Sequence, residues 1–179
     1  MRTAFHIAFA FSLLGLTTAS ASGSSDLWQG ERAAFFGIVF IDASLEGEMR
    51  GGPSEEEVAR TAMLEEHLSS VLQEQGLLLA DLTPVEAELT RTRNPARCNG
   101  CDLRMARELD ARYSIVAEVQ KISNLIMKMN LQVRDAQTSE LVRGNVADFR
   151  ANTDESWTRA MDVLLSNTVL ADSEGHSDD

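Results

Sequence analysis

Residues 125–134 read LIMKMNLQVR, and apolar side chains alternate with polar ones along this stretch. The apolar set is Leu125, Met127, Met129, Leu131 and Val133; the polar set is Lys128, Asn130, Gln132 and Arg134. A period of two is typical of a strand with one buried face and one wet face. Ser123 and Asn124 predict a turn before this strand, and residues 135–140 predict a turn after it, followed by a strand over 141–151. The sequence therefore predicts an antiparallel meander in the C-terminal half of the chain.

Strands and helices alternate upstream of the meander. Apolar runs rich in β-formers predict strands over 33–41, 77–79 and 113–119. Helical signals cover 54–75, a short segment opened by Thr83-Pro84, and 101–109, and a last helix begins near Asn152. We expect an α/β (α+β) fold with a mixed sheet of about five strands in the order β-α-β-(α)-α-β-β-β-α.

Two helices carry clear packing signals. Ser54 and Glu57 form a capping box, and the stripe that follows predicts a core-facing side. Its members are Val58, Ala62, Leu64, Leu68, Val71 and Leu72. The corresponding stripe of the last helix is Trp157, Met161, Leu164, Leu165 and Thr168.

The N-terminal segment has the organisation of a secretory signal peptide. Arg2 precedes an apolar run of about 13 residues, too short for the roughly 20 that a membrane span needs. Ala19-Ser20-Ala21 fits the small-residue cleavage pattern, so we expect residues 1–21 to be removed and the mature chain to start at Ser22. We further expect a polar leader over 22–32, a single α/β domain over 33–170 and a disordered acidic tail over 171–179. The predicted location is periplasmic or secreted.

The charge of the chain restricts its partners. Twenty-eight acidic and 16 basic side chains give a net charge of −12, which becomes about −13 when Arg2 leaves with the signal peptide. Nucleic acids and anionic lipids require clusters of Lys and Arg, so we expect neither as a partner. The acidity is compatible with basic partners or cations, and equally with a role in solubility alone.

Cys98-Asn99-Gly100-Cys101 is a CxxC motif in an expected oxidising compartment. Asp102 follows where haem attachment needs a His, and a four-ligand zinc site lacks further ligands. A structural disulfide between Cys98 and Cys101 is one interpretation. A redox or soft-metal site, with a thiol next to a helix N-terminus, is a second, and a free dithiol is a third.

Polar side chains follow several predicted strands and turns. They are Asp42, Glu46 and Glu48 after the first strand, Lys121 and Asn124 at the hairpin, and Arg150, Asn152, Asp154 and Trp157 at the start of the last helix. If the first strand neighbours the meander, Asp42, Lys121, Arg150 and Asp154 should converge on one rim, as a binding surface would require. The alternative is that these residues are unrelated caps and turns, with Trp157 in the core.

Catalytic and cofactor motifs find no support in the sequence. There is no G-x-S-x-G nucleophile motif, no phosphate-binding glycine loop and no EF-hand calcium loop. We therefore predict a protein that is not an enzyme, with no catalytic residues, no metal site and no cofactor.

Larger pieces of the sequence resemble known exported proteins. The strand text GLLLAD (76–81), ARYSIVAEV (111–119) and the hairpin text VRDAQTSELV (133–142) resemble the N-terminal domain of TolB and related periplasmic assembly proteins. Over about residues 35–165 the chain resembles an exported bacterial family defined as a domain of unknown function. Four segments carry that resemblance: 42–48, 98–101, 119–125 and 149–157. Ala43 and Ala151 depart from it, because Thr and Gly are expected there.

The resemblance implies a fold and a compartment, and a link to exported quinoprotein alcohol dehydrogenase systems. Our leading hypothesis is a periplasmic accessory or interaction module that serves an exported quinoprotein oxidoreductase or envelope assembly through another envelope protein. The rival hypothesis is a small redox or metal-binding carrier that uses Cys98, Cys101 and the Asp42–Glu48 loop.

Overall fold

The computed structural model describes residues 25–171. The expected signal peptide, its cleavage site and residues 172–179 of the acidic tail lie outside the described residues. The helices are α1 (Ser25–Trp28), α2 (Leu45–Arg50), α3 (Glu55–Glu74), α4 (Glu86–Arg91), α5 (Cys101–Glu108) and α6 (Asp154–Ser166). The strands are β1 (Arg32–Asp42), β2 (Leu78–Leu79), β3 (Tyr113–Ser123), β4 (Ile126–Asp135) and β5 (Leu141–Phe149).

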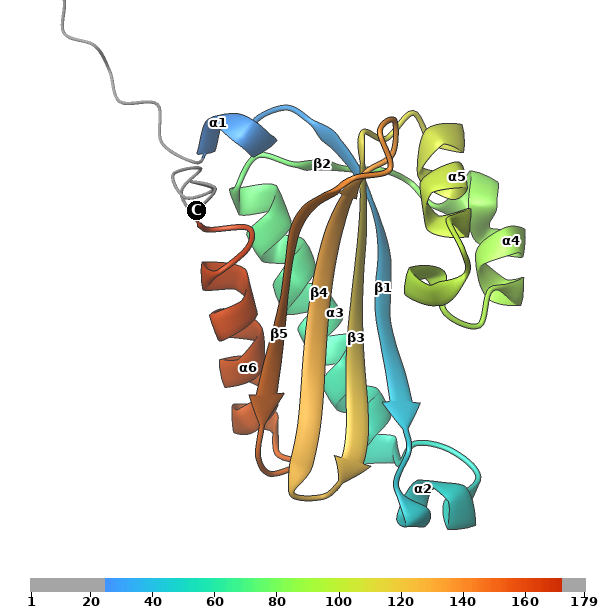
Figure 1. Ribbon diagram of the computed structural model, residues 1–179, viewed down its shortest axis with the longest axis vertical. Helices are drawn as coiled ribbons and strands as arrows, with labels where there is room; N and C mark the ends of the chain where they lie inside the picture. Colours follow the sequence, from blue (N-terminus) through green and yellow to red (C-terminus); the bar gives the residue numbers. More distant parts are fainter. Residues whose placement is uncertain (1–24, 172–179) are drawn as a thin grey trace, which may run out of the picture.

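The five strands form one mixed sheet in the order β2-β1-β3-β4-β5 (Figure 1). Strand β1 is parallel to both β2 and β3, whereas β3, β4 and β5 form an antiparallel meander. The predicted fold class is confirmed.

The two faces of the sheet are covered differently. Helices α3 and α6 pack on one face and enclose the larger core, which includes Tyr113, Leu131 and Trp157. Helix α5 and the α4 region cover only the part of the other face near Ala34, Phe36 and Val116. The remainder of that face, over β3, β4 and β5, carries mainly polar side chains, among them Asn130, Gln132 and Arg134.

Strand β1 contributes side chains to both cores, and a bulge in its middle shifts their alternation. Gly37 has φ +84°, a conformation that suits glycine, and the register with β3 shifts between Phe35 and Ile38. Glu65 of α3 accepts a hydrogen bond from the Ile38 amide at 2.8 Å. Because the bulge reverses the alternation, Phe35 and Ile38 pack on the same core although their numbers differ by three.

The meander follows its predicted pattern with one correction. Met127, Met129, Leu131 and Val133 are fully buried. Leu125 was expected to join them, but β4 begins only at Ile126 and Leu125 is 68% exposed in the turn.

The helices also follow their predictions in part. The α6 stripe is buried as expected, and the capping box of α3 is present. In α3, Leu64, Leu68 and Leu72 are buried, but Val58 and Ala62 are exposed. The start of the stripe was wrong because Glu57, not an apolar residue, is the buried side chain of that turn.

Part of the expected leader belongs to the core. Trp28 of α1 is 1% exposed and packs edge-on against Tyr113, with ring centroids 5.2 Å apart. Its Nε1 donates a hydrogen bond to the Val169 carbonyl at 2.9 Å. The two ends of the described chain therefore meet at one end of the molecule, opposite α2 (Figure 1).

Candidate functional site

The end of the sheet opposite the chain ends gathers most of the polar residues singled out from the sequence. Strands β1 and β3 are parallel and finish at this end, where Asp42 pairs with Lys121. Helix α2, the β3–β4 turn and the N-termini of α3 and α6 lie at the same end (Figure 1). The backbone amide of Ala43 donates to the Lys121 carbonyl at 2.8 Å, which holds the segment after β1 against β3.

A buried cation lies at the centre of this end. Lys121 is 1% exposed, and its Nζ lies 2.7 Å from Glu57 Oε1, 3.4 Å from Glu46 Oε2 and 3.5 Å from Asp42 Oδ2. Asn124 Nδ2 donates to the same oxygen of Glu46 at 2.9 Å, and Asn152 Nδ2 donates to Glu57 Oε1 at 2.8 Å. We call these six residues the Lys121 network: Asp42, Glu46, Glu57, Lys121, Asn124 and Asn152.

The network favours the charged forms of Lys121, Glu57 and Glu46. Burial alone would lower the pKa of Lys121, but the hydrogen bond to Glu57 and the nearby carboxylates outweigh burial and raise it. Burial would raise the pKa of Glu57, but hydrogen bonds from Lys121, the Ser54 amide and Asn152 lower it. The pKa of Glu46 is lowered by the hydrogen bond from Asn124 and by the charge of Lys121. These buried salt bridges therefore join the C-terminal ends of β1 and β3 to the N-terminal end of α3.

Asp42 holds α2 in place. Its Oδ1 accepts a hydrogen bond from the Ser44 amide at 3.0 Å, and the Ser44 hydroxyl in turn accepts one from the Gly47 amide at 3.1 Å, which caps α2. Position 47 requires glycine because the Asp42 side chain lies against its backbone, and a Cβ there would lie 2.1 Å from Asp42 Cγ. The sequence predicted a polar loop over this segment and missed the helix, which has only six residues and directs its two large apolar side chains to solvent.

The start of α6 joins the network from the other side. Asn152 Oδ1 accepts hydrogen bonds from Trp157 Nε1 at 2.9 Å and from Arg60 Nη1 at 3.3 Å. Arg60 also donates to Asp154 at 2.6 Å. Trp157 is fully buried and stacks on Phe40 with ring centroids 5.6 Å apart, so it lies in the core and not on the surface.

The structure leaves two of the candidate residues outside this arrangement. Glu48 is exposed on α2, and Arg150 is exposed beside Asp148 and Phe149 at the end of β5. Neither forms a hydrogen bond or ion pair with a described residue of the network. Sequence reasoning in turn missed Arg60 and the second role of Glu57, since both act through contacts made only in the folded chain.

Contacts within the network satisfy all but one of its buried side-chain polar atoms. Among the described side chains, only Asp42 Oδ2 is buried without a hydrogen-bond partner, and Lys121 Nζ lies 3.5 Å from it. No group of three or more potential metal ligands is found in the 147 residues from 25 to 171. The ion pairs of Lys121 hold the ends of β1 and β3, helix α2 and the N-terminus of α3 together.

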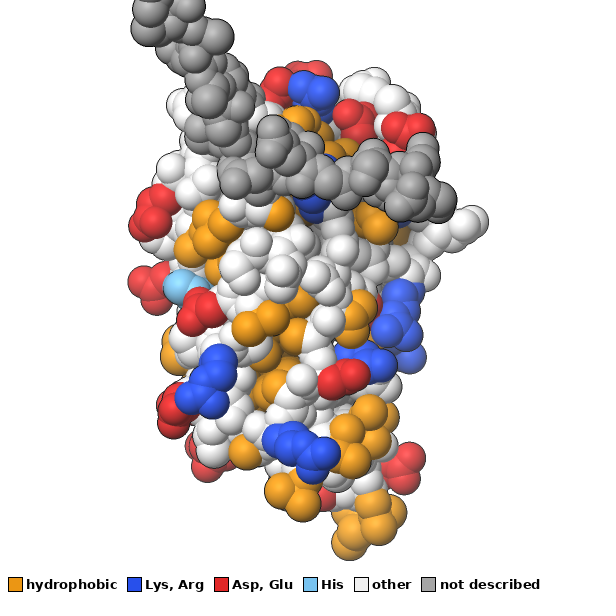
Figure 2. All heavy atoms as spheres, turned by 60° about the vertical axis from the view of Figure 1, so that its left-hand side comes forward, with side chains coloured by type: hydrophobic (Ala, Val, Ile, Leu, Met, Phe, Trp, Pro, Cys, Tyr) orange, Lys and Arg blue, Asp and Glu red, His pale blue; other side chains and the backbone are white. Residues whose placement is uncertain are grey.

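The segments that it holds carry exposed apolar side chains. Leu45 and Met49 lie four residues apart on α2 and are 72% and 82% exposed. Ile122, Leu125 and Ile126 surround the β3–β4 turn and are also exposed. We call these five residues the apolar tip, and Figure 2 shows hydrophobic side chains gathered at this lower end of the molecule. The hydrogen bond from Asn124 to Glu46 joins its two segments.

The CxxC motif lies elsewhere in the fold. A disulfide joins Cys98 to Cys101 at the start of α5, with the two Cα atoms 5.6 Å apart. Asn99 and Gly100 both have positive φ, which suits a tight turn between the two cysteines. No hydrogen bond or ion pair in residues 25–171 connects this turn to the Lys121 network. Over the same range, no helix has both the length and the apolar character needed to cross a membrane.

A family model matches most of the chain. The model is DUF3280, described as "Protein of unknown function (DUF2380)", and it matches residues 31–169. No curated protein matches the sequence.

Several solved structures are similar at low identity. The C-terminal domain of LpoB from Salmonella enterica is 15% identical, covers 68% of this chain and 83% of that chain, and has a TM-score of 0.49. The lipoprotein GNA1162 from Neisseria meningitidis is 12% identical, covers 76% and 93%, and has a TM-score of 0.47. The PelC dodecamer from Paraburkholderia phytofirmans is 10% identical, covers 78% and 89%, and has a TM-score of 0.45. The resemblance to TolB stays an interpretation.

Proposed function

The chain belongs to the DUF3280 family, and from that premise we propose that it is a non-catalytic interaction module of the cell envelope that docks onto another protein through the apolar tip. The observation that carries the proposal is the exposure of five large apolar side chains on two short segments at one end of the fold. Apolar groups clustered in this way on a soluble domain are typical of interaction surfaces.

The Lys121 network supports the proposal because it fixes the two segments before any partner arrives. Helix α2 is only six residues long and could not hold its own shape in water. Its position depends on Asp42, on Glu46 and on the ion pairs of Lys121. A surface held rigid in this way loses less conformational entropy on binding.

A protein partner fits this surface better than a lipid one. The net charge of −12 repels anionic headgroups, which usually attract basic residues to a membrane surface. A partner with an apolar socket and basic residues around it would complement both the tip and the overall charge. A role beside an exported quinoprotein oxidoreductase or in envelope assembly is the specific form of this proposal.

Site-specific photo-crosslinking tests the proposal. A photo-reactive residue placed at Met49 or at Leu125 should give the same protein adduct in intact cells, and one placed at Leu78 should not. Leu78 is 60% exposed on β2, at the other end of the sheet, so it controls for exposure alone. The partner is then identified from the adduct and purified.

Direct binding to that partner completes the test. A Met49→Ser/Leu125→Ser variant should bind at least tenfold more weakly, about 1.4 kcal/mol, while a Leu78→Ser/Leu141→Ser variant should bind as the unchanged chain does. Equal loss in both variants, an adduct that forms equally well from Leu78, or insertion of the tip into lipid vesicles without any protein adduct would contradict the proposal.

A further inference from the structure

A second surface, separate from the apolar tip, has the features of a small-molecule site. A pocket of about 740 Å³ lies between β1 and the region that contains α4, the disulfide and α5. Ligand sites commonly have volumes of about 300–1,000 Å³. The pocket exists because α5 covers only part of this face of the sheet and leaves the later residues of β1 open.

The floor of the pocket is apolar. Phe40 packs in the core on the opposite face, so the alternation of the strand directs Val39 and Ile41 to the pocket side. Both side chains are only partly buried. The disulfide between Cys98 and Cys101 contributes a further apolar part of the wall.

The rim of the pocket is basic although the chain as a whole is acidic. Four arginines and one carboxylate, that of Glu88, line it; the arginines are Arg91, Arg93, Arg97 and Arg104. Arg104 forms an ion pair with Glu88, and Arg97 forms one with Glu118 at 2.7 Å. Within residues 25–171, the side chains of Arg91 and Arg93 have no ion-pair or hydrogen-bond partner. Two guanidinium groups therefore remain available at the mouth of an apolar cavity.

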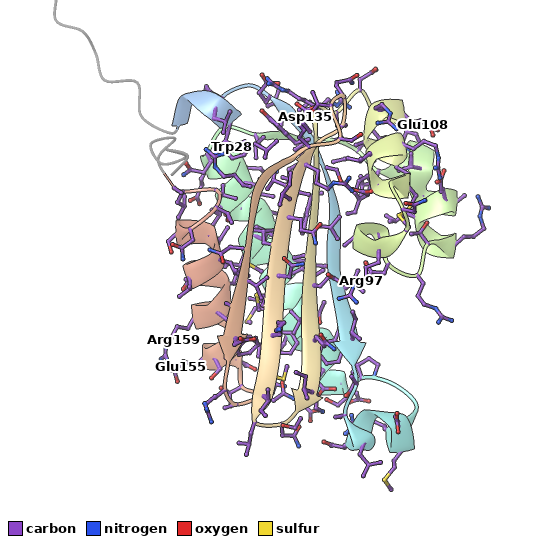
Figure 3. The ribbon with its side chains drawn as sticks, viewed as in Figure 1. Trp28, Arg97, Glu108, Asp135, Glu155 and Arg159 are labelled. Carbon is purple, nitrogen blue, oxygen red and sulfur yellow. A yellow bond between two sulfur atoms is a disulfide. The ribbon has the colours of Figure 1, made fainter. Side chains whose placement is uncertain are left out.

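A buried carboxylate arranges one wall of the pocket in advance. Glu118 of β3 has a side chain that is 5% exposed, and it accepts hydrogen bonds from Asn94 at 2.7 Å, Arg97 at 2.7 Å and Asn130 at 3.3 Å. Asn94 in turn accepts a hydrogen bond from the Ala96 amide at 2.9 Å, which caps the short helical turn Pro95–Arg97. Figure 3 shows Arg97 beside β1 in this region. The wall is thus held by the sheet on one side and by the disulfide on the other.

We propose that this pocket binds a small organic anion with an apolar body, whose carboxylate lies against Arg91 and Arg93 and whose apolar part lies on Val39 and Ile41. Guanidinium groups pair with carboxylates in a two-point geometry that a neutral head group cannot match. The apolar floor would exclude small, fully hydrated anions, because they gain nothing from burial there.

Calorimetry with three probes on the purified chain tests the proposal. Decanoate combines the acidic head and the apolar chain, whereas decanol lacks the charge and acetate lacks the chain. We expect decanoate to bind at least tenfold more tightly than either control, and we expect added salt to weaken its binding. If decanol binds as tightly as decanoate, or if no probe binds in the millimolar range, the proposal is wrong.

Variants identify the place of binding. Arg91→Gln/Arg93→Gln should weaken decanoate binding at least tenfold. Both side chains are exposed, so the thermal unfolding of this variant should match that of the unchanged chain. The matched control is Arg159→Gln on α6, whose guanidinium pairs with Glu155 on the surface (Figure 3) and whose loss should leave binding unchanged. Amide chemical shifts should change around Val39–Ile41 and Arg91–Arg104. Shifts confined to the apolar tip, or an equal loss in the Arg159 variant, would overturn the assignment.

Discussion

Lys121 Nζ lies 2.7 Å from Glu57 Oε1, and both side chains are at most 2% exposed. Removing two charges from water costs several kcal/mol each, so such a pair is retained only where further hydrogen bonds satisfy it. Here Ser54, Asn152, Asp42 and Glu46 complete the surroundings. The pair fixes where β3 and α3 meet, and with them the position of the apolar tip.

This pair should make the stability of the fold depend on pH. The pKa of Glu57 is lowered on folding, so its stabilisation is complete above its unfolded value of 4.5 and is lost as pH falls through the folded value. Glu57→Gln should therefore cost about 3 kcal/mol near neutral pH and progressively less below pH 4.5. Urea unfolding across a pH series measures this difference. Glu55→Gln, an exposed neighbour in the same turn, is the control, and parallel curves for Glu57→Gln and the unchanged chain would contradict the prediction.

Ala151 should be improved by glycine. Ala151 has φ +70°, which costs an L residue more than it costs glycine, and the next residue, Asn152, donates a hydrogen bond to Glu57. Ala151→Gly should stabilise the fold by about 0.5–1 kcal/mol in urea unfolding. Ala59→Gly in the exposed part of α3 should instead cost about 1 kcal/mol. A loss of stability in both variants would show that Ala151 is not strained.

Neighbouring residues of β4 should differ in how well they tolerate an introduced charge. Leu131 is fully buried between the sheet and the helices, whereas Gln132 faces the open side of the sheet. Leu131→Asp should remove more than about 4 kcal/mol and unfold the chain, and Gln132→Asp should cost less than about 1 kcal/mol. Circular dichroism distinguishes the two outcomes, and equal tolerance would show that the strand register is different.

The disulfide should be a modest stabiliser. Cys98 and Cys101 are only three positions apart, so the loop that the disulfide closes is short. Removing the disulfide should therefore lower the free energy of unfolding by about 2 kcal/mol or less. The double variant Cys98→Ser/Cys101→Ser should fold with a somewhat lower melting temperature, as intact mass and thermal unfolding would show. Reversible exchange with glutathione and reductase-like turnover in the unchanged chain would favour the redox carrier instead.

The parts of the fold that sequence predicted best are those with a long, regular burial pattern. Strand β4 alternates over eight residues from Met127 to Arg134, and α6 buries a full helical stripe, so periodicity alone located both. Helix α2 was missed because its six residues direct Leu45 and Met49 to solvent. The bulge at Gly37 was missed because an apolar run buried on both faces shows no period that a shift could disturb.

The candidate site was predictable only in outline. Strand ends and turns indicated Asp42, Lys121 and Asn152, and the structure joins all three to one network. Glu57 was interpreted only as a capping residue, which it is through Oε2, but its other oxygen accepts from Lys121, 64 positions away. The sequence contains no signal for the arginine-lined pocket, because the pocket forms where α5 leaves the later residues of β1 uncovered. Contacts of that kind depend on tertiary packing, which local patterns do not specify.

The hydrogen bond from Trp28 to the Val169 carbonyl has a practical consequence for orientation. It brings both ends of the described chain to one pole, and the 11 residues of β1 extend roughly 35 Å from there to the opposite pole. A chain immobilised on a sensor surface by either end would therefore present the same face outward. An N-terminal fusion and a C-terminal fusion should give the same association kinetics. In both, the apolar tip would lie about one domain length from the sensor surface.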